Sequence, residues 1–124
     1  MKNLLTILFG LTMIGAGAVH FLMPGIYTPF FPASLPGLAI VYASGVVEIT
    51  LGLCTLIPRY RRIGTLGILV LMIAFLPLHV LDVFNDNPVI GSKLVAWVRL
   101  PFQFVFIAWA WFIHKRQTAS GLIT

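Results

Sequence analysis

The stretch from residue 37 to residue 57 reads GLAIVYASGVVEITLGLCTLI, and it is uncharged except for Glu48 near its middle. At 1.5 Å rise per residue it is long enough to cross a hydrocarbon core of about 30 Å. Glu48 is the only glutamate in the chain. A carboxylate at this depth costs roughly 3 kcal/mol on insertion scales, so it should face protein or water rather than lipid. We therefore expect the rest of the chain to surround Glu48 and to supply its partners.

Three further apolar runs have a similar length, at residues 4–23, 63–81 and 94–113. Only 9% of the chain is charged and its mean hydropathy is +1.04, whereas a soluble domain carries about 25% charged residues. Four spans and short connections leave no room for a soluble domain. The sequence predicts an all-α fold, an integral membrane four-helix bundle that forms a single transmembrane domain over residues 1–124.

Residues 24–36 contain four prolines, which exclude a continuous helix between the first two spans. The segment is uncharged and carries three aromatic residues, so we expect an outer loop in the membrane interface. Folding over the mouth of the bundle as a lid is the alternative. At the other end of the chain, residues 117–124 are expected to be a flexible tail.

The basic residues are grouped in a way that predicts orientation. Arg59, Arg61 and Arg62 lie in the second connection, and Lys115 and Arg116 follow the last span. The positive-inside rule places these residues on the cytoplasmic side, so both termini are predicted to be cytoplasmic. This distribution accounts for the net charge of +5 without a nucleic-acid partner.

Polar side chains of all four spans are predicted to lie in the outer half of the bundle. Counted from the outer ends of the spans, the candidate ligand-binding residues are His20, Ser44, Glu48, His79, Arg99 and Gln103. The inner half offers almost no polar group before the arginines. The sequence thus predicts a polar pocket that opens outward and is closed toward the cytoplasm.

The simplest electrostatic interpretation pairs Glu48 with Arg99, either as part of a binding site or only as a lock between the second and fourth helices. A metal site built from His20, His79 and Glu48 would match a two-histidine, one-carboxylate pattern, but Arg99 would repel the cation, and we expect no metal. Cys54 is the only cysteine, which excludes an internal disulfide or dithiol exchange. No constellation of catalytic residues stands out.

Four segments carry a resemblance to a known family, at residues 17–21, 44–48, 75–79 and 98–103. They read GAVHF, SGVVE, FLPLH and VRLPFQ, and with Pro24 the chain resembles the DoxX-like membrane proteins over about residues 4 to 113. The resemblance implies a small four-helix protein of the bacterial inner membrane, associated with quinone-linked sulfur oxidation or oxidative-stress complexes. It also implies His20, Glu48, His79, Arg99 and Gln103 as the functional set. The lone Cys54 sets the chain apart from relatives proposed to perform thiol chemistry.

These observations lead to three hypotheses for function. The first is a multi-pass inner-membrane protein that binds a small amphipathic or quinone-like ligand, with a quinone or a lipid as the bound molecule. It would serve as an accessory subunit of a membrane redox or oxidative-stress system, with a redox protein as partner, a homo-oligomer as a further option and no catalytic activity of its own. The second is a proton-coupled small-molecule transporter, and the third is a structural or assembly factor. A closed pocket beside Arg99 would favour the first, a wet route past Cys54 the second, and a filled core the third.

Overall fold

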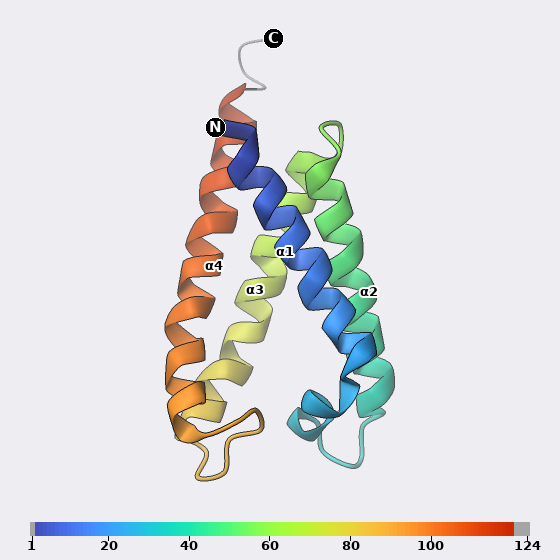
Figure 1. Ribbon diagram of the computed structural model, residues 1–124, viewed down its shortest axis with the longest axis vertical. Coiled ribbons are helices and arrows are strands. Elements are labelled where there is room, and N and C mark those ends of the chain that lie inside the picture. Colours follow the sequence, from blue (N-terminus) through green and yellow to red (C-terminus); the bar gives the residue numbers. More distant parts are fainter. Residues whose placement is uncertain (1, 121–124) are drawn as a thin grey trace.

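The computed structural model describes residues 2–120, and this part of the chain forms four long α-helices joined by short connections (Figure 1). They are α1 (Lys2–Leu22), α2 (Gly37–Leu56), α3 (Arg61–Phe84) and α4 (Lys93–Ser120). No β-strand occurs within these residues. The predicted all-α four-helix bundle is confirmed.

All four helices are long and apolar enough to cross a membrane. Large hydrophobic side chains point outward along their whole length, which is normal only where the surroundings are lipid. The fold is therefore that of a multi-pass membrane protein.

The two ends of the bundle differ in composition. The start of α1, the end of α4 and the α2–α3 connection lie together at one end, which we call the basic end (Figure 1). Arg59, Arg61, Arg62, Lys115 and Arg116 belong to it. The opposite end, which we call the loop end, carries the α1–α2 and α3–α4 connections.

The helix boundaries depart from the predicted ones chiefly in α3 and α4. Helix α3 continues through Pro77 and past residue 81 to Phe84, so Asp82 belongs to a helix and not to the loop. Helix α4 reaches Ser120, seven residues beyond the predicted end of the span. The prediction of a flexible tail is wrong for residues 117–120, which are helical, and residues 121–124 lie outside the described part.

The segment between α1 and α2 folds as two short 3₁₀ turns, η1 (Pro24–Ile26) and η2 (Thr28–Phe30). Both have a proline in the first turn, where its missing N–H costs no hydrogen bond. The predicted break in helical structure over residues 24–36 is confirmed.

Glycines bring α1 and α2 into backbone contact at two levels. A Cβ added to Gly17 would lie 2.8 Å from the Gly45 carbonyl oxygen, and one added to Gly52 would lie 2.9 Å from that of Gly10. The seven-residue spacing on both helices repeats the same contact two turns along. Small residues at such positions let membrane helices pack without a hydrophobic driving force.

The hydrophobic core lies in the half of the bundle nearer the basic end. Phe9 is fully buried, and its ring meets the rings of Phe106 at 6.4 Å and of Trp109 at 4.8 Å. The cluster is completed by Met13, Ile68, Leu69, Met72, Ala110 and Ile113. These contacts close the bundle at this level, including the seam between α1 and α4.

Candidate functional site

A cavity of about 390 Å³ lies in the half of the bundle nearer the loop end. All six sequence-predicted residues line it: His20, Ser44, Glu48, His79, Arg99 and Gln103. Counting depth along each span was thus enough to bring them to one place. The core around Phe9 and Met13 closes the cavity toward the basic end.

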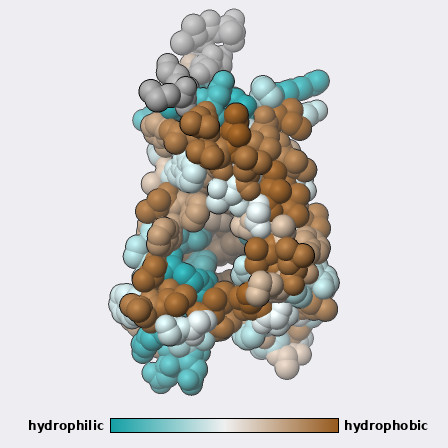
Figure 2. Space-filling view, viewed as in Figure 1, coloured by the Kyte–Doolittle hydropathy of each residue, from teal (hydrophilic) through white to brown (hydrophobic). Residues whose placement is uncertain are grey.

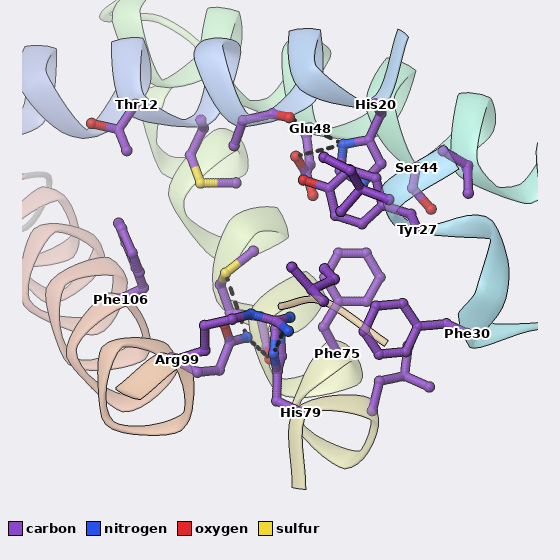
Figure 3. Close-up of a pocket in the computed structure, with 18 of the residues that line it drawn as sticks. Thr12, His20, Tyr27, Phe30, Ser44, Glu48, Phe75, His79, Arg99 and Phe106 are labelled. Carbon is purple, nitrogen blue, oxygen red and sulfur yellow. Dashed lines mark hydrogen bonds and ion pairs between the residues drawn. The ribbon is translucent and has the colours of Figure 1, made fainter. Parts of the chain in front are cut away.

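The cavity has two polar sides that face each other (Figure 3). Glu48, His20 and Ser44 gather on the α1–α2 side, whereas Arg99 and His79 lie on the α3–α4 side. The predicted pair of Glu48 with Arg99 is wrong: Arg99 binds Asp82 and His79 on its own side, and Glu48 lies next to His20 on the other.

Arg99 is paired with Asp82, which is not one of the six site residues predicted from the sequence. Its Nη1 lies 3.2 Å from Asp82 Oδ2, and the Asp82 side chain is 1% exposed. The other carboxylate oxygen, Oδ1, accepts a hydrogen bond of 2.7 Å from the Val89 amide. Asp82 therefore fixes both the arginine and the α3–α4 connection. Its position three residues after His79 in a helix, on the same face, is the sequence signal that could have revealed it.

The second half of the Arg99 guanidinium donates to His79. Nη2 lies 2.9 Å from His79 Nδ1, and because a guanidinium has only donors, Nδ1 must accept. The imidazole hydrogen is therefore assigned to Nε2. Arg99 also lies over the ring of Phe30 from η2, with 5.8 Å between the guanidinium carbon and the ring centroid. The α3–α4 side thus carries a fixed cation and further N–H donors.

On the opposite side, Glu48 has no fixed cation. Its carboxylate is buried, and His20 Nδ1 lies 3.5 Å from Oε2, too far for a good hydrogen bond. Nδ1 instead donates to the Ala16 carbonyl at 3.1 Å. Among the described residues Glu48 Oε2 has no hydrogen-bond partner. A buried acceptor left without a donor costs about 1–3 kcal/mol, so this atom is able to accept a hydrogen bond from a donor inside the cavity.

Gln103 and Ser44 take smaller parts. The Gln103 amide donates to the Met72 carbonyl at 2.8 Å, on the bottom of the cavity next to the core. The Ser44 hydroxyl donates to the Ile40 carbonyl in its own helix at 2.9 Å. Both residues therefore face the cavity with one hydrogen-bonding group already occupied.

The loop segments supply the wall at the loop end, which the sequence did not predict in detail. Tyr27, between η1 and η2, stacks on His20 with ring centroids 4.2 Å apart. Burial raises the pKa of Tyr27 above its ordinary value of 10; the Glu48 carboxyl adds to this effect and Arg99 opposes it. Phe30, Phe31 and Ile90 complete this wall.

The cavity is reached from the side of the bundle. Helices α1 and α4 contact each other sparsely, and Figure 2 shows a hollow on the face that they form, with hydrophilic atoms inside and hydrophobic residues around it. Helix pairs α1–α2 and α3–α4 are, by contrast, closely packed. The sequence predicted an opening at the outer end; the loop residues line that end, and the visible hollow faces sideways.

No group of three metal-ligating side chains occurs within residues 2–120. His20 with Glu48 and His79 with Asp82 lie on opposite sides of the cavity. What the arrangement offers is hydrogen bonding at two ends of an otherwise apolar space.

The fold and the cavity define a small multi-pass membrane protein with a polar site inside a helical bundle. The chain belongs to the family described as "Domain of unknown function (DUF8561)", whose model matches residues 9–114. No curated protein and no solved structure matches it.

Proposed function

We propose that this protein binds a small amphipathic or quinone-like ligand in the cavity between its two hairpins. The observation that carries the proposal is the buried Glu48 Oε2, which has no hydrogen-bond partner within residues 2–120 and faces a side that holds Arg99 and His79. A ligand with a hydroxyl or amine at one end and a carbonyl or other acceptor at the other would satisfy both sides. The volume of about 390 Å³ falls in the range of small-molecule sites, about 300–1,000 Å³.

The side opening supports a ligand that dissolves in the bilayer. The hollow lies on an apolar face between α1 and α4, where lipid would surround a membrane-spanning bundle. A molecule with an apolar body could enter there without passing through water. Quinones and lipids have this character, which agrees with the resemblance to DoxX-like proteins.

The same resemblance supports the wider role that we propose. The protein would act as an accessory subunit of a membrane redox or oxidative-stress system, in a bacterial inner membrane, with a redox protein as partner. The basic end would face the cytoplasm, because arginine and lysine are retained on that side.

The two other hypotheses have less support. A proton-coupled transporter needs a polar path through the bundle, but the core around Phe9 and Ile68 occupies the half nearer the basic end. A purely structural factor needs neither a cavity nor a buried carboxylate oxygen without a hydrogen bond, and residues 2–120 contain both.

The test is native mass spectrometry with extraction of bound small molecules from protein purified in mild detergent. Ala16 lines the cavity, so Ala16→Leu fills it without a change of charge, and Glu48→Gln removes the carboxylate. Gly15→Leu is the matched control, because Gly15 is exposed and a Cβ added there meets nothing within 4 Å. We expect a compound in the wild type and in Gly15→Leu that is lost from the other two. Absence of any compound from the folded wild type, or equal retention in all four proteins, would exclude this function.

A further inference from the structure

A second cavity, of about 340 Å³, lies at the basic end and is separate from the first. It is bounded by the first turns of α1, the first residue of α3 and the last turns of α4. Arg61 and Arg116 line it together with hydrogen-bonding side chains of Asn3, Thr6 and Gln117. None of the functions considered above makes use of this space.

Both arginines are held in place by their surroundings. Arg61 donates from Nε to the Thr55 carbonyl at 3.0 Å and from Nη2 to the Leu56 carbonyl at 3.3 Å, so it covers the end of α2. Its Nη1 takes no part in these two bonds. The Arg116 guanidinium lies 4.6 Å from the centroid of the Phe112 ring. Arginines fixed in this way lose little side-chain entropy when they bind an oxyanion.

The electrostatics of this end favour an anion. The described residues that line the cavity include no carboxylate. Of the three acidic side chains in the sequence, Asp82 and Asp86 are near the loop end. The first turns of α1 border the cavity, so the positive end of the α1 dipole lies close to it. Two cations and several neutral hydrogen-bonding side chains thus line one cavity.

We propose that this cavity binds a phosphate group. Phe112 and neighbouring apolar side chains form part of the wall, and the cavity lies where the apolar helices reach their basic ends. An anionic phospholipid, with its headgroup between Arg61 and Arg116 and its chains beside α4, fits these surroundings. A soluble phosphate compound shares the recognised group, and the experiment separates the two sources. The proposal does not depend on the ligand of the first cavity.

The experiment counts phosphatidylglycerol retained by the purified protein in native mass spectrometry, after reconstitution in vesicles of phosphatidylglycerol and phosphatidylcholine. Arg116→Gln is compared with Arg59→Gln, which removes the same charge at the same end from an exposed residue outside the cavity. We expect Arg116→Gln to weaken retention of one lipid about tenfold, the effect of losing a charged hydrogen-bonding partner, and Arg59→Gln to leave it unchanged.

A second arm adds inorganic phosphate to protein in phosphatidylcholine alone. A rise in melting temperature that Arg116→Gln abolishes, without selective retention of phosphatidylglycerol, would assign the site to soluble phosphate compounds. If Arg116→Gln does not fold, Thr6→Val keeps the charge and removes one hydrogen-bonding group of the lining, and it should weaken retention as well. Equal losses in both arginine variants, or no loss in either, would overturn the proposal.

Discussion

The pairing of Arg99 with Asp82 can be tested by removing one negative charge at a time. Asp82→Asn and Glu48→Gln each replace a buried carboxylate by an amide of the same shape. The Arg99–Asp82 distance is 3.2 Å, and at an effective dielectric constant of about 20 the attraction is about 5 kcal/mol. Part of this lost attraction is offset, because burying a neutral amide has a smaller desolvation penalty than burying a charged carboxylate. Removing one partner of a buried pair costs about 3–5 kcal/mol in total.

We expect Asp82→Asn to lower the free energy of unfolding by about 3 kcal/mol, at the low end of that range because asparagine can still accept from the Val89 amide. Glu48→Gln should cost much less, because no fixed cation faces that carboxylate and its Oε2 has no hydrogen bond. The measurement is reversible unfolding in mixed micelles, followed by far-ultraviolet circular dichroism. A loss in Glu48→Gln as large as that in Asp82→Asn would show that Glu48 is the partner of Arg99 and would refute the assignment.

Three further predictions concern packing and the loop. Gly17→Ala should destabilise the protein by about 1–3 kcal/mol, since the new Cβ would lie 2.8 Å from a carbonyl oxygen of α2. Gly15→Ala is the control: its Cβ meets open space, so it should be neutral or stabilising in the same unfolding assay. Phe9→Ala should lower the free energy of unfolding by about 3–5 kcal/mol, because the ring is fully buried between α1 and α4; an effect below about 1 kcal/mol would contradict this packing. In an absorbance titration of the phenol groups, the component that Tyr27→Phe removes should ionise above pH 10, because burial favours the neutral phenol; ionisation at or below pH 10 would show that Tyr27 is exposed.

The sequence was sufficient for the helices and for the depth of the polar groups. Both follow from the rise per residue of a helix that must cross an apolar layer, so Glu48 and Gln103 could be placed at similar depths without knowledge of the packing. The close approach of α1 and α2 occurs at glycines such as Gly17 and Gly45, but the sequence did not indicate which helices these glycines bring together.

What the sequence could not supply were the rotation of each helix and the paths of the loops. Arg99 was paired with the wrong carboxylate because α3 was ended before Asp82, and one further turn brings that residue into reach. The wall formed by Tyr27 and Phe30 depends on how an irregular segment folds back, which no periodic pattern records. Depth along a span is a local property, whereas the choice of partner depends on the whole bundle.

The Arg99–Asp82 pair lies within a single hairpin, and this bears on how the chain enters the membrane during synthesis. An isolated arginine or aspartate costs roughly 3 kcal/mol at insertion when it lies at the centre of a span. The cost is smaller but still unfavourable nearer a helix end, where Asp82 and Arg99 lie. Because α3 and α4 are adjacent in the chain and closely packed, the two charges can be transferred together as a neutral unit. Glu48 is in the other hairpin, which enters first and brings no such cation with it. The hairpin of α3 and α4 is made second, and its Arg99–Asp82 pair carries no net charge as it inserts. Its arrival completes the cavity around Glu48, which is already in the membrane.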